Sequence, residues 1–206
     1  MPRATAFTDD LFSAATSVDG PRTLVEDTQG GVRYWPGFLP SKLAAHWFDE
    51  LKDAVAWEAQ RRPMYDRIVD VPRLVASYRF EDEGVPAPLI DAGQRLREHL
   101  HQPFNAVGLN FYRDGQDSVA PHGDKMHMLV EGHPIALVSL GSKRRMTIRE
   151  NASRRAVHID LEPGSLLVMS HASQLTHEHG IPKTRDVVGP RISLAYRVRP
   201  PRSARG

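Results

Sequence analysis

The chain has 206 residues, of which 40% are hydrophobic and 25% are charged, and its formal net charge is +2. This length and balance fit one globular domain with a sizeable core, and the absence of cysteine excludes disulfides, thiolate metal sites and cysteine nucleophiles. Any bound metal must therefore use imidazole and carboxylate ligands. No apolar run approaches the roughly 20 residues of a membrane-spanning helix, and the N-terminal residues lack a secretory pattern. We therefore expect a cytoplasmic protein with no membrane partner.

The N-terminal half of the chain predicts a tail, a strand and two helices. Residues 1–28 are polar without sustained periodicity, which predicts a loose N-terminal tail. A short strand is expected over Val32–Trp35. Apolar residues then recur at helical spacing after Ser41, whose side chain suits an N-cap, and a second helix is expected over about 87–101. The intervening residues 58–76 are basic and aromatic with two prolines, and they predict mostly loop.

From residue 106 onward the pattern changes to short runs that alternate in polarity or are rich in β-branched residues. The expected strands are Val107–Arg113, Ile135–Leu140, Arg145–Arg149, Val157–Leu161, Ser165–Met169 and Arg191–Arg197. Helices followed by many strands predict a mainly β protein of the α+β class, a β-sandwich or jelly roll with helices on one face. The basic, proline-bearing residues 199–206 predict a C-terminal tail.

A short motif, His122-Gly123-Asp124, is the first candidate for chemistry. Side chains at i and i+2 of a strand point to the same face, so an imidazole and a carboxylate converge there. With one distant histidine they form a set of two histidines and one carboxylate, which leaves open positions for a bidentate co-substrate and dioxygen. Spacing does not choose the third ligand among His171, His177 and His179. The competing interpretation is a solvated pair in a surface turn.

The last predicted strand carries a second candidate group. Arg191, Ser193 and Arg197 share one face of it, and apolar residues occupy the other. The arginines point either into water from an edge strand or into a barrel mouth, where guanidinium groups bind a dicarboxylate through paired hydrogen bonds. Asn110 and Tyr112 share a face of the strand at 107–113, and they are candidates to bind the same ligand.

Several short segments, taken in order, resemble the AlkB family of iron(II)/2-oxoglutarate dioxygenases, in its nucleic-acid repair branch. The resemblance extends from about Pro36 to Arg197. It rests on Phe104–Tyr112, His122-Gly123-Asp124, Pro134-Ile135, Val138–Gly141, Gly164–Met169, His179–Lys183 and the R-x-S-x-x-x-R pattern from Arg191 to Arg197. The resemblance implies one dioxygenase domain over residues 29–198, folded as a double-stranded β-helix behind N-terminal helices.

The family pattern also implies which residues bind the metal and the co-substrate. His179 lies at the position of the third iron(II) ligand, beside His122 and Asp124, so His177 becomes a neighbour. The resemblance further implies Fe(II), 2-oxoglutarate and O2 as cofactors. The residues that it places at 2-oxoglutarate are Asn110, Tyr112, Arg191 at the distal carboxylate, Arg197 near the chelating end, and Ser193 where the family carries asparagine.

The substrate side is implied by the same resemblance. A nucleotide-recognition lid is expected within about residues 58–80, where Arg73 contacts phosphate or base and Tyr65 or Tyr78 stacks on a flipped base. Met126 occupies the position at which repair members commonly carry an acidic residue that reads the damaged base. This departure leaves the identity of the substrate base open.

The function implied is oxidative demethylation of N-alkylated nucleobases in DNA or RNA, by a monomer whose partner is nucleic acid. One alternative keeps the chemistry but acts on a small molecule or a protein. A second alternative is a non-catalytic nucleic-acid-binding jelly roll. Basic residues around the hairpin predicted at 145–161 are either a phosphate track or a solvated face.

Overall fold

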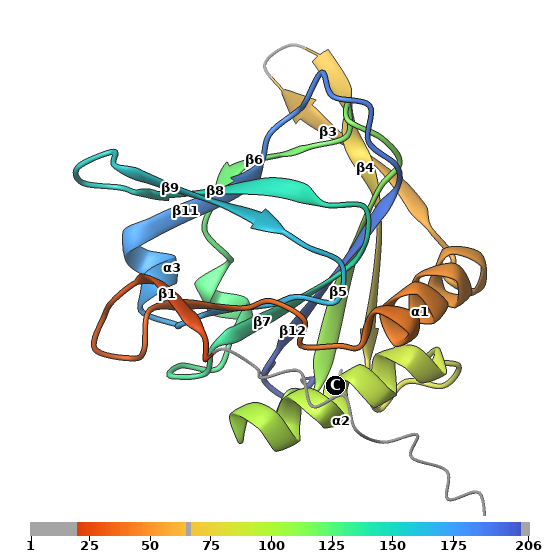
Figure 1. Cartoon of the computed structure of the whole chain (residues 1–206), viewed down its shortest axis with the longest axis horizontal. Coiled ribbons are helices and arrows are strands. Elements are labelled where there is room, and N and C mark those ends of the chain that lie inside the picture. The colour runs from red at the N-terminus through yellow and green to blue at the C-terminus, as the bar shows by residue number, and fades with distance from the viewer. Residues whose placement is uncertain (1–19, 65–66, 203–206) are drawn as a thin grey trace, which may run out of the picture.

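The computed structural model describes residues 20–64 and 67–202 of the chain (Figure 1). These residues form a large and a small β-sheet in which all the strand pairs are antiparallel. The larger sheet has the order β1-β2-β10-β7-β12-β5-β4-β3, and the smaller has the order β6-β11-β8-β9. Two sheets joined in this way form the predicted double-stranded β-helix, so the predicted fold class is confirmed.

The bounds of the elements follow the order of the chain. The larger sheet contains β1 (Arg22–Val25), β2 (Val32–Trp35), β3 (Glu58–Met64), β4 (Arg67–Arg79), β5 (Ala106–Tyr112), β7 (Ile135–Gly141), β10 (Leu166–Met169) and β12 (Arg191–Arg197). The smaller sheet contains β6 (Val119–His122), β8 (Arg144–Glu150), β9 (Ala156–Leu161) and β11 (His177–Ile181). The helices are α1 (Ser41–Ala54), α2 (Ala87–Leu100) and α3 (Ser173–Thr176), with a 3₁₀ turn, η1, at Met126–Met128.

Helices α1 and α2 cover one face of the larger sheet, and the smaller sheet lies over the other face (Figure 1). Trp47 and Leu51 of α1 and Leu96 of α2 are buried, since apolar residues recur on one side of each helix. They pack against the outward-facing residues of β5, β7 and β12. No helix within the described residues is long and apolar enough to cross a membrane.

A second apolar cluster fills the space between the two sheets. Residues of β2, β5, β7 and β10 meet residues of β8, β9 and β11 in this cluster. The alternation read in residues 191–197 explains why a polar site can lie beside it. Ile192, Leu194 and Tyr196 of β12 face the helices, while Arg191 and Ser193 face the space between the sheets.

Three local expectations are wrong. Residues 22–25 lie in the predicted tail but form β1, which pairs with β2, so the folded domain begins before residue 29. Residues 58–64 and 67–76 lie in the antiparallel β3–β4 pair rather than in a loop. Proline is tolerated there because β3 is the sheet edge and because Pro72 of β4 lies opposite the register shift between Ala59 and Arg61. Ser41 is the first residue of α1, and Pro40 is the cap, without a side-chain hydrogen bond.

Candidate metal centre

Three side chains form the cluster that the structure offers to a metal ion. One potential ligand atom from each of His122, Asp124 and His179 lies within 4.8 Å of the others. Within the described residues this is the only such group of three or more His, Asp or Glu side chains. Two imidazoles and one carboxylate match the facial donor set of non-haem iron(II) oxygenases, so the residues present fit that metal.

The two histidines are brought together by the pairing of β6 with β11. His122 and His179 are directly opposite each other in this antiparallel pair, and their ring centroids are 4.6 Å apart. Gly180 allows the close approach, because a Cβ atom there would lie 2.9 Å from the carbonyl oxygen of Val119. Nδ1 of His122 is 2.9 Å from the carbonyl oxygen of Ala120, a contact that leaves Nε2 to bind a metal.

Asp124 is placed by contacts outside the strand. β6 ends at His122, so the expected strand geometry covers only the first residue of the motif. The main-chain N–H of Asp124 donates to Oε1 of the buried Gln174, over 3.2 Å. Arg197 donates from Nε to Oδ2 of Asp124 over 2.7 Å and forms an ion pair with the same oxygen. Gln174 thus holds the main chain of Asp124, and Arg197 holds its carboxylate.

The electrostatics of the cluster favour metal-binding protonation states. Burial raises the pKa of Asp124, but the charge of Arg197, together with its hydrogen bond, outweighs burial and holds the pKa below its ordinary value. Burial, together with the neighbouring His122, lowers the pKa of His179 to about 4. At neutral pH the first group is a carboxylate and the second a neutral imidazole, and these forms are the ones that coordinate metals.

His177 lies on β11 two residues before His179, but it is not part of the cluster. Its Nδ1 is 2.9 Å from the hydroxyl oxygen of Thr176. Spacing along the strand could not separate the two histidines, whereas their distances to Asp124 and His122 do.

A narrow cavity extends from the metal cluster to a buried guanidinium. His122 and His179 line one part of it, and Arg191 lines another. The Arg191 side chain is completely buried, and its Nη2 donates to Oγ of Ser139 over 2.9 Å. Its Nε and Nη1 have no hydrogen-bond partner within the described residues. Two unpartnered donors on a buried cation favour a carboxylate ligand at this end of the cavity.

Burial also lowers the pKa of Arg191, to about 10, so the group still carries its charge at neutral pH. The ring of Tyr112 lies beside it, with its centroid 5.3 Å from Cζ of the guanidinium. Because β12 lies between β5 and β7, the alternative of a solvated edge strand is excluded. A charged guanidinium at one end and a metal cluster at the other suit a dicarboxylate that chelates the metal.

The other residues predicted at 2-oxoglutarate line the same cavity. Asn110, Tyr112, Ser193 and Arg197 all take part in it, and Asn110 is the direct neighbour of Ser193 across the β5–β12 pair. Oδ1 of Asn110 already accepts a hydrogen bond from Nε of Arg73, over 2.7 Å. The structure therefore brings together all five residues that the sequence placed at the co-substrate.

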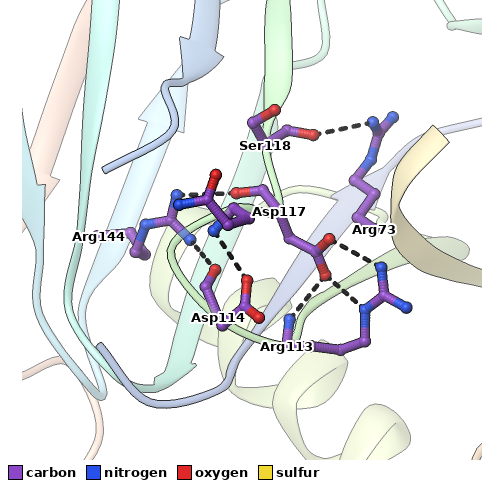
Figure 2. A network of polar contacts seen from close by, with 7 residues as sticks. Arg73, Arg113, Asp114, Asp117, Ser118 and Arg144 are labelled. Carbon is purple, nitrogen blue, oxygen red and sulfur yellow. Dashed lines mark hydrogen bonds and ion pairs between the residues drawn. The ribbon is translucent and has the colours of Figure 1, made fainter. Parts of the chain in front are cut away.

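A buried arginine, Arg144, holds the loop before β6 (Figure 2) and the segment directly after β11. Arg144 of β8 donates to the carbonyl oxygens of Asp114 and Asp117, which precede β6, over 2.8 and 2.9 Å. It also donates to the carbonyl oxygen of Pro182, directly after β11, over 2.8 Å. Asp117 in turn accepts three hydrogen bonds from the side chain and main chain of Arg113. This network fixes β6 against β11 from the end opposite the metal.

The outcome differs among the residues that were predicted to contact the substrate. Tyr65 lies outside the described residues. Arg73 lines the metal cavity, and its Nη1 donates to the carbonyl oxygen of Ser118 over 3.4 Å (Figure 2). Tyr78 is on the opposite face of β4, where it packs against the helix-side core, so its predicted role at the substrate is not supported. Met126 lines neither this cavity nor the wider one that opens from His122 and Asp124, whereas Lys125 and Met128 line the wider one.

A wider cavity of about 650 Å3 opens outward from His122 and Asp124. Its described lining carries four cationic residues and one acidic residue, Asp124, which is itself bound to Arg197. The cations are Arg73, Lys125, Arg197 and Arg199. A positive lining favours an anionic substrate, because oppositely charged groups attract most strongly where water is partly excluded.

The basic residues of the β8–β9 hairpin do not form a free phosphate track. Arg145 pairs with Asp160, and Lys143 pairs with Glu162. Arg149 and Arg154 both pair with Glu178, so this carboxylate offsets part of their charge. The solvated and ion-paired interpretation of this hairpin is therefore the better one.

Three contributors to the site were not found from the sequence. Ser139 binds Arg191, Gln174 holds Asp124, and Arg199 lines the outer cavity although it lies in the predicted tail. Ser139 and Gln174 act through contacts between distant segments, for which the sequence carries no local signal. Arg199 follows the odd-numbered polar face of β12, so continued alternation could have indicated it.

Comparisons with known proteins agree with this geometry. The family model of the 2OG-Fe(II) oxygenase superfamily matches residues 77–197. The human protein named DNA oxidative demethylase ALKBH2 is 32% identical over 173 residues, which cover 73% of this chain and 66% of the relative. The mouse alpha-ketoglutarate-dependent dioxygenase alkB homolog 3 is 31% identical over 183 residues, covering 79% and 64%. The chain thus matches slightly less than two thirds of the length of each relative.

Among solved structures, the fold is similar to that of OsALKBH1, with a TM-score of 0.55 at 17% sequence identity. The similarity covers 81% of this chain and 97% of the other. At this identity the likeness concerns the fold alone.

Proposed function

Because this chain belongs to the 2OG-Fe(II) oxygenase superfamily, and within it to the AlkB family, we propose that it oxidatively demethylates N-alkylated nucleobases in DNA or RNA. The family uses Fe(II), 2-oxoglutarate and O2. The observation that carries the proposal is the single cavity that joins the His122–Asp124–His179 cluster to the buried Arg191.

In this proposal the metal is held by His122, Asp124 and His179. Arg197 keeps one carboxylate oxygen of Asp124 occupied and so leaves the other for the metal. When bound, Fe(II) with 2-oxoglutarate and O2 supplies the oxidation of an N-methyl C–H bond, and the hydroxymethyl product releases formaldehyde. The chain's own residues position the reactants around that chemistry.

Arg191 binds the distal carboxylate of 2-oxoglutarate through its free Nε and Nη1 donors. Leu137, Met146 and Met169 form an apolar wall beside it. This wall excludes water and so strengthens the attraction between the guanidinium and the carboxylate. Asn110, Tyr112 and Ser193 line the rest of the cavity that holds the co-substrate.

The substrate enters from the wider cavity on the other side of the metal cluster. Its volume, about 650 Å3, is in the range of ligand pockets that enclose a small molecule. Its positive lining supports a substrate that carries phosphate, which a nucleic acid does and a neutral peptide does not. The names of the two relatives, a DNA demethylase and an alkB homolog, point in the same direction.

The test is turnover of N-methylated oligonucleotides, single- and double-stranded DNA and RNA, with iron(II), ascorbate and 2-oxoglutarate. We expect equal amounts of succinate and formaldehyde from at least one oligonucleotide, and neither product from a His122→Ala/Asp124→Ala double variant. Methylated peptides and free nucleosides serve as competing substrates. Faster turnover of either would favour the small-molecule or protein alternative, and oligonucleotide binding without iron binding would favour a non-catalytic module.

We also propose that the protein is a cytoplasmic monomer. Light scattering during gel filtration tests the monomer, since a mass near 23.1 kDa is expected.

A further inference from the structure

Arg199 is a cation of the outer cavity whose hydrogen bonds are made by its main chain and not by its guanidinium. Arg197 is bound to Asp124, and Arg73 is bound to Asn110 and to the carbonyl of Ser118. Within the described residues the guanidinium of Arg199 forms neither an ion pair nor a hydrogen bond. Of the nearby carboxylates, Asp124 is paired with Arg197, and Asp82 is paired with Arg202.

The surroundings of Arg199 are electropositive. Burial, followed by the charges of Arg197 and Arg79, lowers the pKa of its guanidinium. The side chain is only partly buried, so it can still meet a ligand from solvent. A half-buried cation beside two others, without a counter-ion of its own, is a favourable place for an anion.

The backbone of Arg199 is fixed independently of its side chain. Its N–H donates to Oδ1 of Asn105 over 2.8 Å, and its carbonyl accepts from Nδ2 of the same residue over 2.9 Å. This pair of bonds positions the guanidinium at the cavity and does not depend on it. Removal of the side chain is therefore not expected to unfold the segment.

Arg199 lies between two cavities. It lines the outer metal cavity together with Lys125, and it lines a second cavity of about 220 Å3 together with Arg79 and Arg202. A chain molecule that places one unit at the metal and continues into the second cavity must pass this side chain. Guanidinium groups bind phosphate through paired hydrogen bonds, which suits a polynucleotide backbone.

We propose that Arg199 binds a backbone phosphate of the substrate strand, next to the nucleotide whose base enters the metal cavity. The assignment rests on the proposed function, since it requires a polynucleotide substrate. It gives Arg199 a role in binding the strand and none in binding iron(II) or 2-oxoglutarate.

The experiment compares Arg199→Ala and Arg199→Lys with Arg95→Ala, which removes the same charge from an exposed position on α2. Each protein is loaded with iron(II) and 2-oxoglutarate without oxygen, and binding of a methylated single-stranded oligonucleotide is measured over a range of salt concentrations. For Arg199→Ala we expect about tenfold weaker binding at low salt. We also expect the slope of log K against log salt to shrink by about 0.7. Arg199→Lys should keep the slope, and Arg95→Ala should match the wild type.

Turnover assays then test whether Arg199 binds the phosphate that flanks the methylated nucleotide, rather than the methylated nucleotide itself. With a methylated trinucleotide, Arg199→Ala should raise KM, while KM for 2-oxoglutarate stays unchanged. With a methylated nucleoside or its 5′-monophosphate, the variant and the wild type should be equal. The assignment would be overturned if Arg199→Ala raised KM for the nucleoside or the monophosphate as much as for the trinucleotide. It would also be overturned if the salt slope of Arg199→Ala equalled that of the wild type. If the wild type demethylates oligonucleotides in that case, only the assignment of Arg199 fails. If the wild type neither binds nor demethylates them, the proposed function fails with it.

Discussion

Arg197 donates a hydrogen bond from Nε to Oδ2 of Asp124 over 2.7 Å, and its Nη2 forms an ion pair with the same oxygen at 2.6 Å. Its third nitrogen, Nη1, donates to the carbonyl oxygen of Ala195 over 2.9 Å, so the guanidinium is itself fixed. This arrangement occupies Oδ2 and leaves Oδ1 of Asp124 as the oxygen available to a metal. The arginine thus orients the carboxylate without occupying the metal position.

The first prediction concerns this orientation. Arg197→Met keeps most of the side-chain volume but removes the donors, so Asp124 can rotate. We expect 2-oxoglutarate turnover to fall by about 10- to 100-fold, which is the usual effect of removing a group that orients a metal ligand. Turnover at saturating iron measures this, with Arg95→Ala as the control for the lost charge. Unchanged turnover in Arg197→Met would mean that Asp124 is positioned by Gln174 alone.

The second prediction uses the unpartnered donors of Arg191. Arg191→Met removes a buried cation that has no counter-ion within the described residues, so the ligand-free variant should be at least as stable as the wild type. The variant should lose the rise in Tm that 2-oxoglutarate gives the wild type. Its KM for 2-oxoglutarate should increase by about 10- to 100-fold, because charge-assisted hydrogen bonds are lost. A rise in Tm with 2-oxoglutarate equal to that of the wild type would place the co-substrate elsewhere.

The third prediction concerns the contact between the two metal-binding strands. In Gly180→Ala the new Cβ atom would lie 2.9 Å from the carbonyl oxygen of Val119 and 3.0 Å from the nitrogen of Pro121. Both are backbone atoms, so β6 must move away from β11 and carry His122 away from His179. We expect iron affinity to fall at least tenfold, as measured by anaerobic titration. Gly20→Ala is the matched control, since nothing lies within 4 Å of a Cβ atom there.

The fourth prediction concerns stability and pH. Burial raises the pKa of Asp117, but hydrogen bonds from the side chain and main chain of Arg113 outweigh it, so the pKa lies below 3.8 in the folded protein. A lowered folded-state pKa stabilises the protein above the unfolded-state value, and this contribution is lost as the pH falls through the folded-state pKa. Asp117→Asn should therefore lower the free energy of unfolding by about 1–3 kcal/mol at neutral pH.

Urea unfolding at several pH values checks the direction of this pH dependence of stability. The difference between the wild type and Asp117→Asn should be constant near neutral pH and should shrink below pH 3.8. A difference that grows as the pH falls would contradict the arrangement around Asp117.

The sequence was sufficient for the parts of the site that follow a local pattern. Alternation along residues 191–197 correctly put Arg191, Ser193 and Arg197 on one face, because a strand has a fixed repeat of two residues. The helices were found for the same reason, with a repeat of 3.6 residues. In contrast, the β3–β4 pair was missed because its prolines indicate loop, and only its position at the sheet edge makes them acceptable.

Long-range contacts account for the remaining differences. The choice of His179 over His177 depends on the register of β11 against β6, which the spacing of the histidines does not contain. The place of Tyr78 was missed because its face of β4 is set by the pairing with β5. The unsatisfied donors of Arg191 are likewise a property of the folded chain, since they exist only once β12 is buried between its neighbours.

The most direct test of the central claim is the iron(II) content of the wild type and of two single variants, His177→Ala and His179→Ala, titrated without oxygen in the presence of 2-oxoglutarate. We predict one iron(II) per chain for the wild type and for His177→Ala, and a large loss of affinity for His179→Ala. Iron binding that survives in His179→Ala but is lost in His177→Ala would contradict the assignment of the metal centre.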